Sequence, residues 1–193
     1  MFSFAETMAD PRTWLLLFGA LCVAPLSAQQ LKGHIGERTE FGKKLVLLQT
    51  RGSGEVPIDS VLIARDGNFQ FKIPFKTLGF YQLVLNDTDH VDLILNPREP
   101  LVDLGFDSIP LEQHVHVRTS DENKRLSEYK FVSKKTQAIQ AAVFQKKQQL
   151  QPADTAQLAA LDSVGLRAGK MKANYLAQLT ERAPGSYFTK VIQ

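Results

Sequence analysis

Two histidines are the side chains best placed for metal binding. His114 and His116 stand two positions apart in HVHV. Because alternate residues of a β-strand point to one face, the pair could bind zinc or copper. Zinc needs a third or fourth ligand, which His34 and His90 supply only if the fold brings them close. Since such pairs are commonly surface features, we expect no metal site and keep His114 and His116 as candidates.

An acidic segment, NDTDHVD, is the second possible cation site. Asp87 and Asp89 have the spacing of the first two ligands of a calcium loop. Val91 then interrupts the series, and Asp92 follows it. Clusters of Asn and Asp are primarily turn formers, so we interpret this segment as a turn.

Two glycine-containing stretches resemble nucleotide-binding loops but fail at defining positions. In GERTEFGKK, five residues separate the glycines, one too many for a phosphate-binding loop, and Lys44 replaces the magnesium-binding hydroxyl. In GSGEVP, Pro57 replaces the third glycine of a dinucleotide fingerprint. The chain also has no G-x-S-x-G nucleophile motif. We therefore expect no catalytic residue, no cofactor and no enzyme activity.

The only cysteine, Cys22, lies in an apolar run of 13 residues, WLLLFGALCVAPL, that follows Arg12. A bilayer span needs about 20 apolar residues, whereas a signal peptide needs fewer. We predict that residues 1–28 are a signal peptide, cleaved after Ala28, and that this segment makes the only membrane contact. The protein is then exported to the periplasm or cell envelope, and without cysteine it has no thiol chemistry.

Two alternatives to a cleaved signal remain open. The segment could be a retained membrane anchor. It could also carry a lipid on Cys22, although the preceding residue, Leu21, is larger than such a signal requires.

Residues 29–118 have the pattern of an antiparallel β-sandwich. About seven to eight short strands alternate with turn signals such as NDTD and NPREP. Asp66-Gly67 separates two apolar runs, which predicts a hairpin. Phe69 and Phe71 should then point together into the core.

Residues 119–183 have the pattern of an antiparallel helical hairpin, which makes the fold class α+β. Thr119 and Glu122 are spaced as a capping box at the first helix. Pro152 separates the two helices. The apolar positions of each helix recur at intervals of three and four, as one buried face requires. They are Tyr129, Val132, Thr136, Ile139, Val143, Lys146 and Leu150, then Leu158, Leu161, Gly165, Ala168, Lys172, Tyr175 and Leu179.

The last segment, residues 184–193, begins another helix. Ser186 is suited to cap SYFTKVIQ. We expect this segment to be the start of a truncated third helix, or a linker to a domain missing from this chain.

Charge divides the chain near residue 119. Residues 29–118 contain ten Lys and Arg and twelve Asp and Glu, whereas residues 119–193 contain twelve and six. A basic half can bind nucleic acid. In an exported protein, a solvated helix surface or an acidic partner explains it better, so we expect no nucleic acid partner.

The order of segments resembles a known family. LKGHIG, VPIDSVLIARDGNFQFKI, GFYQLVL, VDLILNP, TSDENKRLSEYKFV and PGSYFTKVI follow one another. This order resembles the amino-terminal β-rich domain of unknown function that precedes the thioredoxin-like domain in periplasmic thiol–disulfide oxidoreductases of the TlpA/ResA type. That family's chemistry rests on a C-x-x-C pair, which is absent here.

The resemblance implies a non-catalytic accessory or interaction region. It would position the redox domain or contact a partner, either a thioredoxin-like domain or an envelope protein. The alternative is a free-standing periplasmic binding module for a peptide, a glycan or an envelope protein.

Overall fold

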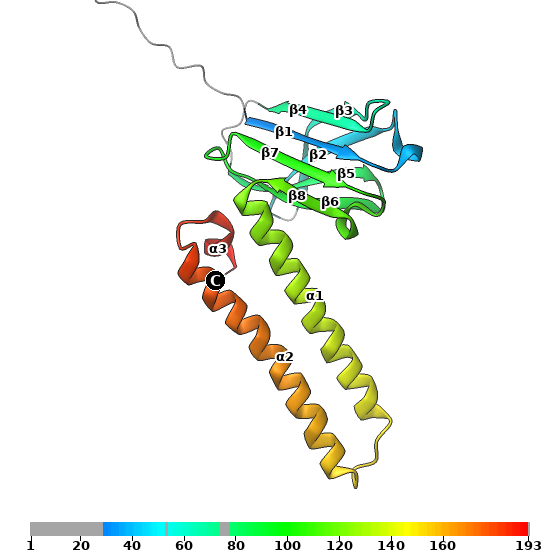
Figure 1. The fold of residues 1–193 in the computed structure, drawn as a ribbon, viewed down its shortest axis with the longest axis vertical. Helices are drawn as coiled ribbons and strands as arrows, with labels where there is room; N and C mark the ends of the chain where they lie inside the picture. Colours follow the sequence, from blue (N-terminus) through cyan, green and yellow to red (C-terminus); the bar gives the residue numbers. More distant parts are fainter. Residues whose placement is uncertain (1–28, 53, 74–77, 193) are drawn as a thin grey trace, which may run out of the picture.

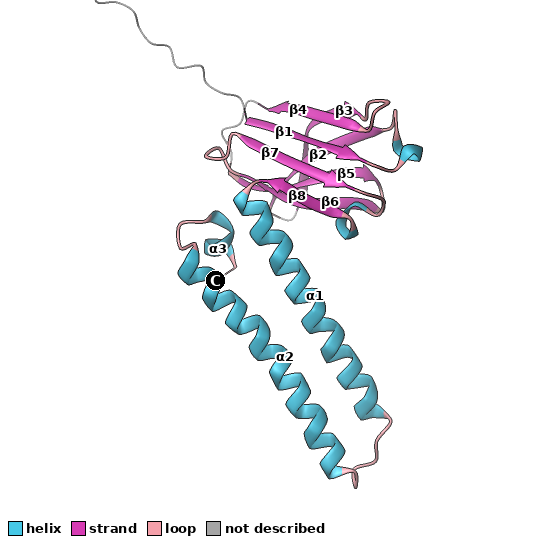
Figure 2. Ribbon diagram, viewed as in Figure 1, coloured by secondary structure: helices cyan, strands magenta, loops and turns pink. Residues whose placement is uncertain are grey.

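The computed structural model describes residues 29–52, 54–73 and 78–192, and the predicted signal peptide and Cys22 lie outside them. The described chain forms a β-sandwich from which two long helices project as an arm (Figures 1 and 2). Two 3₁₀ turns, Arg38–Glu40 and Leu111–Gln113, lie in connections. The strands are β1 Gln29–Ile35, β2 Lys44–Arg51, β3 Gly54–Leu62, β4 Asn68–Ile73, β5 Gly79–Asn86, β6 Asp89–Leu95, β7 Leu101–Phe106 and β8 Val115–Thr119. The helices are α1 Asp121–Gln148, α2 Thr155–Arg182 and α3 Tyr187–Val191.

The strands form two four-stranded sheets, ordered β4-β1-β7-β8 and β3-β2-β5-β6. This arrangement confirms the α+β class and the sandwich followed by a helical hairpin. One pair differs from the prediction, because β1 and β7 run parallel, with Leu31 opposite Val102. Strand pairing depends on contacts far apart in the sequence, which the alternation of apolar residues does not specify.

The sandwich core consists of the inward side chains of both sheets. Burial alternates along β1, β2 and β5, as one buried face requires. Phe69 and Phe71 are both buried and meet edge to face, with ring centroids 6.2 Å apart, which confirms their predicted place in the core.

The Asp66-Gly67 turn joins the two sheets. Gly67 has φ +80°, and its N–H donates to the carbonyl of Ala64 at 2.9 Å. The predicted hairpin is wrong, because β3 pairs with β2 and β4 pairs with β1. A turn signal specifies the local reversal of the chain but not whether the flanking strands pair with each other.

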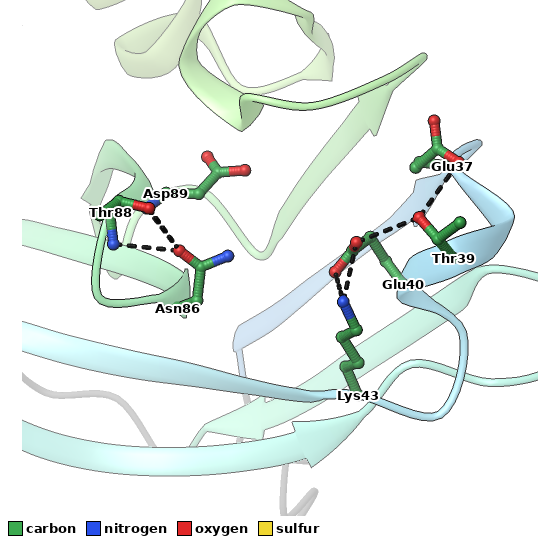
Figure 3. Close-up of polar contacts among 7 residues, drawn as sticks. All are labelled: Glu37, Thr39, Glu40, Lys43, Asn86, Thr88 and Asp89. Atoms are coloured by element: carbon green, nitrogen blue, oxygen red, sulfur yellow. Dashed lines mark hydrogen bonds and ion pairs between the residues drawn. The ribbon is translucent and has the colours of Figure 1, made fainter.

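The connection between β1 and β2 also crosses from one sheet to the other. Its lysine is held internally, since Lys43 Nζ lies 2.9 and 3.0 Å from the two carboxylate oxygens of buried Glu40 (Figure 3). Thr39 donates to Glu40 and to Glu37 in the same loop. This loop joins two strands, unlike a phosphate-binding loop, which leads into a helix.

The arm consists of α1 and α2, which pack against each other along most of the predicted faces. Thr136, Ala168 and Leu179 are buried, as predicted. Lys146 is exposed, and its neighbour Lys147 instead pairs with Asp162 across the arm. Within the described ranges, no helix is both long and apolar enough to cross a membrane.

The first long helix begins one residue later than predicted. Its N-cap is Ser120, whose hydroxyl accepts the N–H of Asn123 at 3.1 Å, so the capping box of Thr119 and Glu122 is wrong. Ser120 has φ +130°, a region that non-glycine residues rarely occupy. Thr119 pairs with Asp103 as the last residue of β8, which leaves Ser120 as the cap.

Candidate functional site

A carboxylate from the sandwich caps the first long helix. Glu99 lies in the turn between β6 and β7, and its side chain accepts three hydrogen bonds from the start of α1. The Ser120 hydroxyl donates at 2.5 Å, and the N–H groups of Asp121 and Glu122 donate at 2.8 and 3.0 Å. The first N–H groups of a helix have no partner within it, so Glu99 fixes the start of α1 to the sandwich.

A second carboxylate connects α1 to α3. Glu122 is buried, and its oxygens accept from the Ser186 hydroxyl at 2.6 Å and from the N–H groups of Tyr187 and Phe188 at 2.9 and 3.0 Å. The Asn96 amide adds a fourth hydrogen bond at 3.2 Å. Glu122 therefore caps the start of α3, more than 60 residues away in sequence. Ser186 is also the N-cap of α3, as predicted.

These hydrogen bonds determine the charge state of Glu122. Burial alone raises the pKa of a carboxyl group. Here the hydrogen bonds from Ser186, Phe188 and Tyr187 outweigh burial and lower the pKa of Glu122 below its ordinary value. The side chain is thus an anion at neutral pH, which suits it to a helix N-terminus.

An amide of α1 pairs with the outer edge of β6. The Ile94 N–H donates to Asn123 Oδ1 at 2.8 Å, and Asn123 Nδ2 donates to the Ile94 carbonyl at 2.7 Å. Asn123 thereby mimics one residue of a neighbouring strand. We call Glu99, Ser120, Glu122, Asn123 and Ser186 the junction, because they join the sandwich, α1 and α3.

Apolar contacts reinforce the junction. Ile94, Leu126, Leu179 and Phe188 are buried together, on β6, α1, α2 and α3. The Phe188 ring meets Tyr129 edge to face, with centroids 5.5 Å apart. Four elements therefore meet in one small core, separate from that of the sandwich.

An open cleft lies beside the junction, where β6 and β8 form the outer edges of the two sheets. We call it the edge cleft. Its volume is about 520 Å³, within the range of ligand pockets. Apolar side chains from both sheets and from α1 line its floor. They are Val91, Leu93, Leu104, Val115, Val117 and Leu126.

A lysine bridges the two walls of the edge cleft. Lys130 Nζ of α1 lies 2.8 Å from Asp92 on β6 and 2.9 Å from Glu112 in the turn before β8. Burial would raise the pKa of Asp92, but hydrogen bonding to Lys130 and its positive charge, with help from Gln82, lower it. Asp92 is therefore an anion at neutral pH, as its contact with Lys130 requires.

The two candidate histidines do not form a shared site. His114 precedes β8 and ends a 3₁₀ turn, so the expectation that both lie on one strand face is wrong. His116 is exposed, with Nε2 2.6 Å from Asp107. The register places His34 opposite Gly105, and Gly105 opposite His116. Across residues 29–52, 54–73 and 78–192, no three His, Cys, Asp or Glu side chains are grouped to hold a metal ion.

The acidic segment between β5 and β6 forms a turn, as interpreted from the sequence. Asn86 Oδ1 accepts from the N–H groups of Thr88 and Asp89 at 3.0 and 2.9 Å (Figure 3). Asp89 is buried and accepts the Leu111 N–H at 2.7 Å. Asp92 forms an ion pair with Lys130. Asn86, Asp89 and Asp92 therefore stabilise the turn and its contacts with neighbouring elements.

Sequence reasoning missed both the junction and the edge cleft. Ser186 was identified as a cap, but nothing local indicated that its partner is Glu122. The edge cleft depends on which strands become outer strands, and sequence periodicity does not report this. Asn123 itself lies among charged and polar residues at the start of α1, so its burial gave no local signal.

Comparison with known proteins identifies a family. None of the curated proteins matches the chain. A family model described as a domain of unknown function matches residues 30–126, half of the chain, and this range includes Glu99, Glu122 and Asn123. The chain therefore belongs to this family, DUF4369.

Proposed function

We propose that this chain is a non-catalytic interaction region that fixes the direction of the segment following its sandwich. The observation that carries this proposal is the junction. Glu99 anchors α1 to the sandwich, and Glu122 anchors α3 to α1. Charged hydrogen bonds at helix starts are strong and directional, so α3 has one preferred position.

The finer proposal is an accessory region of an exported thioredoxin-like thiol–disulfide oxidoreductase. Its support is the resemblance in the order of segments, together with membership of the DUF4369 family. In this role the region positions a redox domain or contacts an envelope partner in the periplasm. The chemistry belongs to a C-x-x-C pair in the other domain.

The sequence encoded directly after Gln193 tests the finer proposal. We expect a continuous reading frame that encodes a C-x-x-C pair in a thioredoxin-like domain. A stop codon at that position, or a continuation without the pair, would contradict the accessory role.

The edge cleft favours a second candidate, a free-standing binding module for a peptide, a glycan or an envelope protein. It is an open pocket with an apolar floor and charged walls, which is typical of a ligand site. A chain purified from its native host should then retain a ligand in native mass spectrometry or capture one specific partner. Absence of both would count against this candidate.

A further inference from the structure

Strand edges differ in how well they are protected. An outer strand presents unpaired N–H and C=O groups that can pair with another chain. The outer strand β3 offers fewer such groups for pairing, because Pro57 lacks an N–H. Neither β6 nor β8 contains a proline. The register shifts in their pairings lie at Val84/Asn86 and Asp103/Leu104. Since α1 and the Leu111–Gln113 turn pack beside parts of β6, the part of these edges that stays open is the part that lines the edge cleft. The edge cleft lies between these two edges.

The backbone of β6 directs hydrogen-bonding groups toward the edge cleft. Both backbone groups of Ile94 face away from β5, because they bond to Asn123. Alternate residues of an antiparallel strand direct their groups to the same edge, so those of Asp92 and His90 also face outward. Asn123 therefore occupies the position at Ile94, and the next outward-facing position, Asp92, lines the edge cleft.

The edge of β8 has the same property. The Asp107 N–H donates to the His114 carbonyl, which continues the pairing of β7 with β8. By the same alternation, the backbone groups of Val115 and Val117 point away from β7. Both valines line the edge cleft.

The chemistry of this wall selects a peptide over a lipid. An acyl chain can cover the apolar floor but cannot satisfy N–H and C=O groups, and unsatisfied polar groups are costly to bury. An extended peptide does both, because its backbone pairs with the strand and alternate side chains enter the floor.

Charge at the mouth adds a preference for an acidic residue. Lys130 is neutralised by Asp92 and Glu112. Lys134, one turn further along α1, lines the same cleft and has no ion-pair partner among the described residues. Phe131 beside it is 68% exposed, which offers an apolar contact next to the free charge.

We propose that the edge cleft binds an extended peptide, which adds a strand to β6, places alternate apolar side chains on the cleft floor and directs an acidic residue to Lys134. This inference rests on the proposed interaction role and names the class of partner.

Selection from a random short-peptide display library, against the full chain, tests the proposal. We expect enriched peptides to alternate apolar and polar residues and to contain an acidic residue. The best peptide, labelled with a fluorophore, should bind the Val117→Lys variant about tenfold more weakly. Binding to Lys134→Glu should weaken about threefold, as for a surface ion pair. The matched control is Val56→Lys, which changes an exposed valine on the β3 edge and should leave binding unchanged.

Backbone methylation of the same peptide tests strand addition itself. Methylating amides at alternate positions facing β6 should weaken binding about tenfold, whereas methylating the intervening amides should not. Loss of enrichment, equal binding to Lys134→Glu, or insensitivity to the methylated position would each overturn the proposal. So would displacement of the peptide by palmitic acid, which would identify a lipid site. A stop codon after Gln193 would contradict the accessory role without affecting these results.

Discussion

At the scale of single residues, Glu122 organises the region after the sandwich. Its backbone N–H donates to Glu99, while its own carboxylate caps α3. One residue therefore links three segments that are far apart in sequence. Its polar contacts are satisfied within the fold, so we assign it a structural role.

Replacing Glu122 with Ala should destabilise the protein by about 3 kcal/mol, because the buried donors of Ser186 and Phe188 and the part-buried N–H of Tyr187 lose a charged acceptor. Urea unfolding followed by circular dichroism measures this change. The matched control is Glu181→Ala on α2, an exposed glutamate whose loss should cost less than about 0.5 kcal/mol. Equal losses of unfolding free energy in the two variants would show that the hydrogen bonds of Glu122 do not stabilise the fold.

The lowered pKa of Glu122 predicts a pH dependence of stability. In the unfolded chain the carboxyl has its ordinary pKa of about 4.5, and folding lowers it. The folded state thus binds this proton less readily, so the stabilisation is complete above the ordinary pKa and is lost as pH falls through the lowered one. The difference in unfolding free energy between wild type and Glu122→Gln should shrink in acid. A constant difference down to the lowered pKa would contradict this prediction.

At the scale of elements, the Asp66-Gly67 turn shows how the sandwich closes. It carries the chain from β3 in one sheet to β4 in the other. Gly67 combines a positive φ with close packing, since a Cβ there would lie 2.4 Å from the Ile35 carbonyl oxygen. The position therefore requires glycine for two separate reasons.

Gly67→Ala should destabilise the fold by about 3 kcal/mol, through backbone strain and steric overlap together. Gly42→Ala is the matched control, because Gly42 has the same φ of +80° but a Cβ added there would meet no atom within 4 Å beyond its chain neighbours. It should cost only about 1 kcal/mol. Thermal unfolding of both variants measures the difference, and equal costs would show that the close approach to Ile35 is unimportant.

Local sequence patterns predicted the helices and strands. They did not predict how the strands pair or which distant residues contact each other. The alternation around Phe69 and Phe71 identified a strand correctly, because a buried face imposes that period. It did not show that β3 and β4 pair with different partners. Glu122 was assigned to the nearest helix start because a capping box is local in sequence, whereas its real partners lie around Ser186. The edge cleft was missed because the places of β6 and β8 at the sheet edges depend on contacts far apart in the sequence.

At the scale of the whole molecule, the sandwich supports a two-helix arm (Figure 1). The sites proposed for binding and for positioning lie at different places in this arrangement. The edge cleft lies between two outer strands, and the junction fixes α3 beside the first turn of α1. In the function we propose, a partner is held at the edge cleft while the junction orients the segment that follows.

The most direct test of the account is the distance between the sandwich and α3, measured by pulsed electron paramagnetic resonance. Spin labels at Gln70→Cys and Lys190→Cys occupy exposed positions, and Cys22→Ser removes the only native thiol. We predict a single narrow distance distribution that broadens when Glu122→Ala is added and stays narrow with Glu181→Ala. A distribution that is already broad with Glu122 present, or that is unaffected by Glu122→Ala, would contradict the claim that the junction positions α3.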